Sequence, residues 1–342
     1  MSAYHTPVLL DESVSALITD TAGVYADATF GGGGHSAEIL ARLSAEGRLI
    51  AFDKDSEALR NGIDDDRLTL VHADFRFIRN FALYLSKNRS SERPAKTGTE
   101  PFAGDAVGAG NDGGFQGLTG ILADLGVSSH QFDSEHRGFS FRFEDAPLDM
   151  RMNAGEGENM KTNAVKGEND KTAATVVNTY TEEELERIFR IYGEVENSRA
   201  LARLVVSART CAPIHTTGDL DRAIEKVTPK AAPHKYLAKV YQALRITVND
   251  EMRSLEKFLE GAAASLRSGG RLVVITYHSL EDRMVKNFIK AGNIDGELKK
   301  DTFGRVEAPL RAVNRKPILP SEEEIAANTR ARSAKLRIAE KL

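Results

Sequence analysis

The stretch GVYADATFGGGGHSAEILARL, residues 23–43, decides the fold. Its first eight residues form the apolar run of a buried strand, and a helix opens after the four glycines. Further strands are predicted at 48–55, 68–75 and 118–126. This alternation of strands and helices predicts an α/β protein with a parallel, doubly wound sheet, which binds ligands at the carboxyl ends of its strands.

Helical patterning dominates the middle of the chain. Thr181 and Glu184 match a capping box at the start of a helix predicted over 181–208. Further helices are predicted at 217–228 and 234–263 from the spacing of their apolar residues. We therefore expect this part of the chain to be mainly helical.

Strand patterning returns toward the C-terminus, at 269–279 and 335–342. Such a return predicts a helical domain inserted into a sheet domain that the C-terminal part completes. We expect residues 1–136 and 237–342 to form the sheet domain and residues 137–236 to form the inserted domain.

Two polar segments interrupt this pattern. Residues 86–117 carry seven glycines and no apolar periodicity, which predicts a flexible, disordered-type surface insertion. The second segment, 153–175, contains GENMKT at 157–162 and the near-copy GENDKT at 167–172. One duplication indicates a local expansion and not a solenoid, which needs at least three repeats.

The composition is that of a folded chain without a membrane segment. A length of 342 residues suits about two domains, and a hydrophobic content of 41% excludes wholesale disorder. No apolar run is long enough for a bilayer span, and the N-terminus does not resemble a signal peptide, so we expect a cytoplasmic protein. The single cysteine, Cys211, excludes an internal disulfide and a thiolate metal cage, and we expect it to be buried.

Charge is distributed unevenly. Residues 235–342 carry 21 lysines and arginines against 14 acidic residues, whereas the whole chain has a net charge of −4. A basic portion suits a partner that carries phosphates, although solvated surfaces often show a similar excess.

The glycine run from Gly31 to Gly34 lies where bare main chain and the free N–H groups of a helix N-terminus can approach a ligand. Asp53 ends the next strand, 22 residues after Gly31, where an acid binds the ribose hydroxyls of an adenosine cofactor. A tight turn beside a surface acid is the alternative, but position and spacing together favour a nucleotide site.

Local spacing does not decide which nucleotide binds. Residues 32–37 fit the loose G-x-G-x-x-A pattern of dinucleotide sites, and residues 27–33 resemble a methyltransferase turn, D-x-G-x-G-x-G, with one glycine replaced. A single base-binding position at Asp74 and Phe75, with an acid at Asp124 after the fourth strand, favours S-adenosylmethionine, which has one base and no pyrophosphate.

The segment RGFSFRFEDAPLDMRM, residues 137–152, interleaves arginines with phenylalanines. This combination can hold phosphates and stack bases, which makes Arg137, Phe139 and Arg142 candidate RNA contacts. The alternating phenylalanines also fit a half-buried hairpin, which the spacing alone favours.

The segment YHSLEDR, residues 277–283, places His278 beside Ser279. We exclude a serine nucleophile because no G-x-S-x-G elbow is present, and Ser279 with Asp282 predicts a capping box instead. His278 follows a predicted strand, so it is a candidate for lining the cleft. The eight histidines lack metal-binding spacings, so we predict no metal site.

Several blocks together resemble the bacterial ribosomal RNA small subunit methyltransferase H family. They include HTPVLLDE (5–12), DATFGGGGHS (27–36), DLGVSSHQFD (124–133), ALRITVNDE (243–251) and NTRARSAKLR (328–337), in the family's order. The resemblance implies a class I methyltransferase with an inserted helical substrate-recognition domain. It also implies methylation of the N4 amine of a decoding-centre cytosine in 16S rRNA, by direct in-line transfer from S-adenosylmethionine.

The resemblance further implies which residues bind. The expected cofactor contacts are Gly33, Gly34, His35, Asp53, Phe75, Asp124 and Gln131. The RNA-binding candidates are Arg137, Phe139, Arg142, His278, Arg330 and Arg332. Acceptors for the amine must localise its conjugated lone pair, and we hypothesise that a main-chain carbonyl near Leu125 and the Asp124 carboxylate serve, with Asp124 shared with the cofactor.

Two rival functions remain at this stage. A nicotinamide-dependent oxidoreductase shares the glycine loop and Asp53 but gives no role to the arginine–phenylalanine segment. A non-catalytic ribosome-assembly factor would keep the basic portion without needing the cofactor residues. The sequence leaves open the oligomeric state, a homodimer included, and whether the substrate is naked RNA or an assembled subunit.

Overall fold

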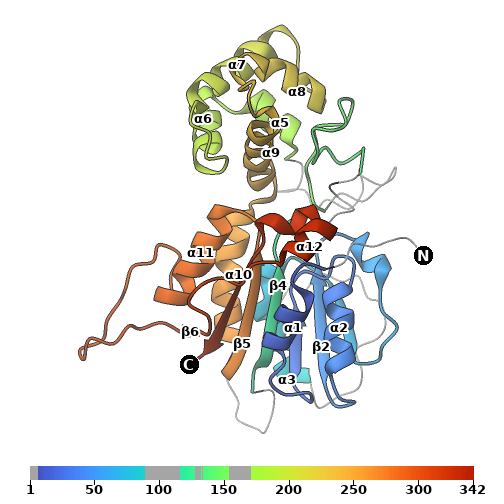
Figure 1. Cartoon of the computed structure of the whole chain (residues 1–342), viewed down its shortest axis with the longest axis vertical. Helices are drawn as coiled ribbons and strands as arrows, with labels where there is room; N and C mark the ends of the chain where they lie inside the picture. The colour runs from blue at the N-terminus through green and yellow to red at the C-terminus, as the bar shows by residue number, and fades with distance from the viewer. Residues whose placement is uncertain (1–6, 89–115, 128–131, 133, 154–170) are drawn as a thin grey trace.

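The computed structural model describes residues 7–88, 116–127, 132, 134–153 and 171–342. A seven-stranded sheet forms the lower part of the molecule (Figure 1). Its strands are β1 (Val24–Asp27), β2 (Arg48–Asp53), β3 (Leu68–His72), β4 (Leu118–Asp124), β5 (Leu266–Thr276), β6 (Leu310–Ala312) and β7 (Lys335–Lys341). They lie in the order β3-β2-β1-β4-β5-β7-β6, with β1 to β5 parallel and β7 antiparallel to both neighbours. The predicted fold class is confirmed, because this is the class I methyltransferase arrangement.

Helices cover both faces of the sheet. On one face lie α1 (Leu10–Leu17) and α2 (Gly34–Arg42), and on the other lie α3 (Ile78–Asn88), α10 (Glu251–Ser265) and α11 (Ser279–Ala291). The central strands are therefore buried from both sides, and β4 buries six of its seven residues. Burial on both faces explains why these strands have continuous apolar runs instead of alternating patterns.

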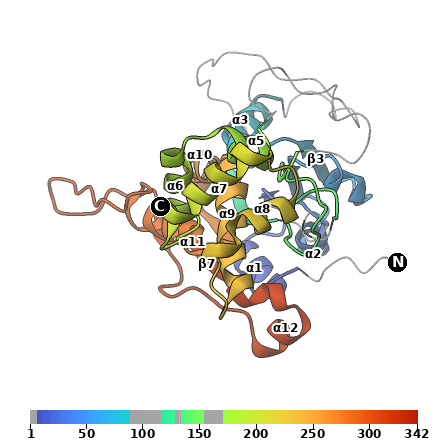
Figure 2. The same ribbon diagram turned by 90° about the horizontal axis from the view of Figure 1, so that it is seen from above.

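Five helices form a second layer above the carboxyl ends of the strands (Figures 1 and 2). They are α5 (Ala173–Thr179), α6 (Glu182–Ile191), α7 (Ser198–Cys211), α8 (Thr217–Ile224) and α9 (Pro233–Asn249), which pack around their own apolar core. The residue limits expected for the two domains stay a prediction, and α9 crosses one of these limits.

Two long helices expected from periodicity are each divided in two. The predicted helix 181–208 is α6 and α7, with Glu194 at a φ of 49° between them. The predicted helix 234–263 is α9 and α10, separated by Asp250 at a φ of 50°. One left-handed residue turns the chain without disturbing the apolar spacing on either side, so periodicity alone runs across the break. The capping box of Thr181 and Glu184 is confirmed.

Other local expectations need correction. Helix α3 continues to Asn88, so the predicted insertion at 86–117 begins too early; its residues 89–115 lie outside the described residues. Residues 154–170 of the second polar segment also lie outside them, and α5 occupies its C-terminal end. Cys211 is exposed at the end of α7 and not buried. Short β6 was not expected.

The C-terminal part returns to the top of the sheet. Helix α12 (Glu322–Ala327) lies beside α1 in both views, and the Leu9 N–H donates to Glu324 Oε1 at 2.7 Å. The short helix η5 (Thr329–Ser333) follows, which brings Arg330 to the carboxyl ends of the strands. Within the described residues, no helix is long and apolar enough to cross a membrane.

Candidate active site

A cavity of about 710 Å³ opens at the carboxyl ends of β1 to β4. The chain leaves β1 toward β2 on one side and later adds β4 on the other, so the cavity lies at the point where the strand order reverses. Parallel α/β sheets bind ligands at such points, and the volume suits a nucleotide-sized ligand. Its wall includes Gly31, Gly32, Gly34, His35, Asp53, Phe75, Phe132, Asp124, Arg142, Arg245, Glu251, Tyr277, Glu281 and Arg330.

The glycine loop forms the floor of this cavity. Gly31 and Gly33 have φ values of +52° and +78°, and Gly33 precedes α2 without a side-chain cap. A Cβ atom on Gly34 would lie only 2.2 Å from Pro7 Cγ. Glycine is therefore required here both for the turn and for the close packing that leaves main-chain N–H groups at the start of α2.

Asp53 ends β2 and is tied to this loop. Its Oδ2 accepts from the Gly31 N–H and its Oδ1 from the Asp55 N–H, both at 2.8 Å. Burial raises the pKa of the Asp53 carboxyl above its ordinary value, although the two main-chain donors partly offset this effect. A carboxylate has about four acceptor positions, so the geometry is compatible with ribose hydroxyls as further donors.

Asp124 ends β4 on the opposite side of the cavity. Its Oδ1 accepts from the Tyr277 hydroxyl at 2.7 Å, and its Oδ2 lies 3.7 Å from His35 Nδ1. The His35 ring is buried, and its Nε2 lies 3.2 Å from the Val8 carbonyl. Burial raises the pKa of Asp124, while His35 and the Tyr277 hydroxyl act in the opposite direction. Tyr277 is a site residue that sequence patterns did not single out.

Phe75 occupies the third predicted cofactor position, at the end of β3. Its ring lies edge-on to Phe258, with centroids 5.2 Å apart, and forms part of the cavity wall. The Asp74 side chain caps the short helix η2 (Phe75–Phe77) through the Arg76 N–H. Gln131, the remaining predicted cofactor contact, lies outside the described residues.

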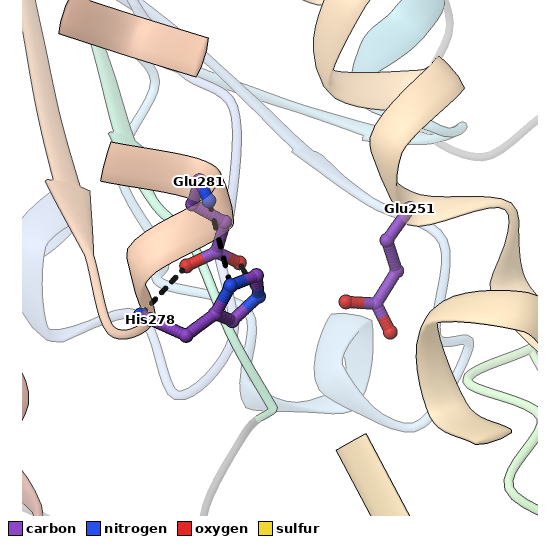
Figure 3. Close-up of side chains that lie close together, drawn as sticks. All are labelled: Glu251, His278 and Glu281. Atoms are coloured by element: carbon purple, nitrogen blue, oxygen red, sulfur yellow. Dashed lines mark hydrogen bonds and ion pairs between the residues drawn. The ribbon is translucent and has the colours of Figure 1, made fainter. Parts of the chain in front are cut away.

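Figure 3 shows three side chains beside the cavity whose charges were not expected to meet. Glu251 begins α10, whereas His278 and Glu281 belong to the start of α11, and their ligand-type atoms lie within 4.8 Å of one another. His278 Nε2 is 3.1 Å from Glu281 Oε1. Arg245, in the last turn of α9, donates to both oxygens of Glu251 at 2.9 Å. These contacts compensate the carboxylates within the protein, and the absence of a metal site stays a prediction.

The start of α11 differs from its expected form. His278 is the N-cap residue and forms the capping box with Glu281, so the box predicted for Ser279 and Asp282 is wrong. Asp282 instead accepts from Arg337 of β7 at 2.6 and 3.1 Å. Ser279 is already helical, and only the position of the strand end could have shown which residue comes first.

Comparison with known proteins agrees with this architecture. The model of the MraW methylase family matches residues 2–342. The chain belongs to this family. The ribosomal RNA small subunit methyltransferase H of Parabacteroides distasonis is 49% identical over 341 residues, which cover 100% of this chain and 98% of the relative. The protein of the same name from Bacteroides fragilis (strain YCH46) is 49% identical over 340 residues, with 99% and 98% covered.

Among solved structures, an rRNA methylase from Streptococcus thermophilus aligns over 97% of this chain and 93% of its own, at 14% identity and a TM-score of 0.33. The family assignment rests on the full-length sequence matches and does not need this likeness. The resemblance seen in the sequence blocks is confirmed, and the chain is a methyltransferase. Membership of a methylase family excludes the oxidoreductase alternative.

Two of the RNA contacts expected from the family resemblance are wrong. Arg137 is 1% exposed, and its guanidinium lies 3.1 Å from both Asp55 and Glu57. Phe139 is 5% exposed and belongs to the apolar core of the five helices. Neither side chain has a surface to offer to a phosphate or a base, because the fold uses both to join the segment 137–152 to its surroundings.

The other candidates are placed in different ways. Arg142 is exposed, and both Arg142 and Arg330 lie over the ring of Phe132, at 5.9 and 5.2 Å, where all three line the cavity. Arg332 is exposed but is not part of the cavity wall. The expectation that His278 lines the cleft is wrong, because its imidazole is 9% exposed and contacts Glu281.

Proposed function

We propose that this methyltransferase transfers a methyl group from S-adenosylmethionine to the N4 amine of a decoding-centre cytosine in 16S rRNA. The names of its relatives support a small-subunit rRNA substrate. The observation that carries the proposal is the cavity, which places the glycine loop, Asp53 and Asp124 in one wall and Arg142 and Arg330 in the same wall system. An rRNA substrate also accounts for a cytoplasmic location.

The residues of the cavity fit S-adenosylmethionine. Bare main chain at Gly34, a buried acid at Asp53 and an aromatic ring at Phe75 lie along one wall, in the order of the strands. We propose that the residues that hold the cofactor are Gly33, Gly34, His35, Asp53, Phe75, Asp124 and Gln131. When bound, the cofactor supplies an electrophilic methyl group on its sulfonium.

The chain must then supply acceptors for the cytosine amine. Its lone pair is conjugated into the ring, and a hydrogen bond accepted from the amine localises that pair on nitrogen. Asp124 Oδ2 and a main-chain carbonyl near Leu125 are the proposed acceptors. The Leu125 N–H donates to the Ile275 carbonyl at 2.9 Å, so β5 holds this segment in place.

Asp124 also suits the removal of the proton. The amine nitrogen becomes acidic once it carries the methyl group, and the Asp124 carboxylate receives the proton as the neutral methylated amine forms. Burial raises the pKa of this carboxyl, which makes its ionised form a stronger base than an exposed aspartate.

The proposed RNA grip lies at Phe132, Arg142 and Arg330. Two guanidinium groups over one aromatic ring combine positive charge with a stacking surface. Arg142 precedes the five helices and Arg330 follows α12, so the grip joins segments from both layers of the molecule. Arg332, exposed next to this site, stays a candidate phosphate contact.

The proposal is tested by binding and by methyl transfer. Calorimetry should show binding of S-adenosylmethionine and none of NAD. Purified protein incubated with labelled S-adenosylmethionine and small subunits from a strain that lacks its own enzyme should yield N4-methylcytidine in the digested rRNA. Cofactor binding without methyl transfer would favour the non-catalytic assembly factor.

A further inference from the structure

We infer that Tyr277 is a positioning residue for methyl transfer, which acts by holding the Asp124 carboxylate in place. The inference rests on the proposed function, in which Asp124 receives the amine proton. The Tyr277 hydroxyl donates to Asp124 Oδ1 at 2.7 Å, a short bond to a charged acceptor. This contact occupies Oδ1 and leaves Oδ2 as the oxygen for the amine.

The sheet brings the two residues together. Strands β4 and β5 are adjacent and parallel, with Asp124 paired to Ile275, so Tyr277 follows one residue beyond the end of β5. The Tyr277 N–H donates to Glu281 Oε2 at 3.0 Å, which fixes the tyrosine main chain to the first turn of α11. Tyr277 is thus held from its own side while its hydroxyl reaches across to β4.

The tyrosine ring also lies against the second proposed acceptor. Gly126 has a φ of +131°, and a Cβ atom built on it would lie 3.2 Å from Tyr277 Cδ2. A side chain at this position would press on the ring as well as strain the turn. The ring therefore packs on the main chain next to Leu125, so Tyr277 orders both groups that face the amine.

The hydroxyl remains a donor throughout. Burial and the neighbouring Asp124 raise the pKa of Tyr277 well above its ordinary value, so the phenol keeps its proton. Besides Tyr277, the groups that face Asp124 are His35, which favours its ionised form, and Asp27 and Glu281, which oppose it. Loss of the tyrosine donor leaves His35 as the main group that keeps Asp124 ionised.

The test compares Tyr277→Phe with the wild type in single-turnover methyl transfer across pH. Without the donor, the Asp124 carboxyl holds its proton more tightly, so the acidic limb of the rate profile should move up by about one pH unit. On that limb the rate should fall about tenfold, with little change in S-adenosylmethionine affinity. In an Asp124→Asn background, the phenylalanine should cause no further loss.

Tyr25→Phe is the matched control. Tyr25 is fully buried in β1, its hydroxyl donates to the Asp20 carbonyl at 2.8 Å, and it does not line the cavity. This variant should melt at a lower temperature and keep the wild-type pH profile. An unmoved profile in Tyr277→Phe, or an undiminished loss in the Asp124→Asn background, would overturn the inference. Wild-type protein that transfers no methyl would remove the proposed function, and this inference with it.

Discussion

The guanidinium of Arg137 lies 3.1 Å from the carboxylates of both Asp55 and Glu57. Its Nη2 also donates to the Met152 carbonyl at 3.1 Å. Because the Asp55 N–H donates to Asp53, this ion pair joins the segment after β4 to the acid proposed to bind ribose. Arg137 thus supports the cofactor wall and does not face the RNA.

Replacement of Arg137 by Met should lower the free energy of unfolding by about 3–5 kcal/mol, because two buried carboxylates lose their counter-ion. Urea denaturation measures this loss. Arg142→Ala is the matched control, since Arg142 is exposed, and it should change stability by less than about 0.5 kcal/mol. Equal stability of the two variants would contradict the structural role of Arg137.

Asp53→Ala should weaken S-adenosylmethionine binding by about 1.5–3 kcal/mol, the range for hydrogen bonds to a charged group. Calorimetry measures the affinity. Asp65→Ala is a control at an acid that pairs with Arg67 and does not line the cavity. If Asp53→Ala binds the cofactor as the wild type does, Asp53 is not part of the cofactor site.

Asp221, in the helical layer, gives a pH dependence of stability. Burial raises the pKa of its carboxyl from 3.8 to about 6, although the Tyr241 hydroxyl partly offsets this. The folded protein therefore binds this proton more tightly than the unfolded chain, and Asp221 costs stability as pH rises from about 4 to 6.

Asp221→Asn should thus stabilise the protein at pH 8 and have little effect at pH 4. Because the side chain is partly exposed, solvent screening limits the gain to about 1 kcal/mol. Melting temperatures at the two pH values measure the difference. A gain of the same size at both would show that the asparagine acts through packing and not through the missing charge.

Arg142→Ala and Arg330→Ala should each weaken RNA binding and reduce the slope of log affinity against log salt by about 1. Cofactor affinity should hardly change. Arg203, an exposed arginine of α7 paired with Glu182, provides a control whose loss should leave the slope alone. Binding of a 16S rRNA fragment at several salt concentrations measures the slopes, and wild-type slopes in both rim variants would rule out the proposed grip.

The sequence predicted those parts of the molecule that depend on local order. Apolar runs marked the central strands because both faces of the sheet are covered, and the strand ends placed Asp53 and Asp124 at one edge. Contacts between distant segments were beyond its reach. The bond of Tyr277 to Asp124 spans 153 residues, and that of Arg137 to Asp55 spans 82.

Arginine, phenylalanine and histidine were the residues whose roles were least predictable. Arg137 and Arg142 have the same sequence surroundings, yet one is buried in an ion pair and the other is exposed. Only the packing of the segment 137–152 against β2 and the helices decides between them. For His278, a shift of one residue in the helix start turned a cleft candidate into an N-cap.

The most direct test of the proposed function is mass mapping of 16S rRNA from a strain in which this gene is deleted. The account predicts that one decoding-centre cytosine lacks a methyl group on N4, and that the wild-type gene restores it while the Asp124→Asn variant does so poorly. An unchanged methylation pattern in the deletion strain, or a methyl group missing from another base or atom, would contradict it.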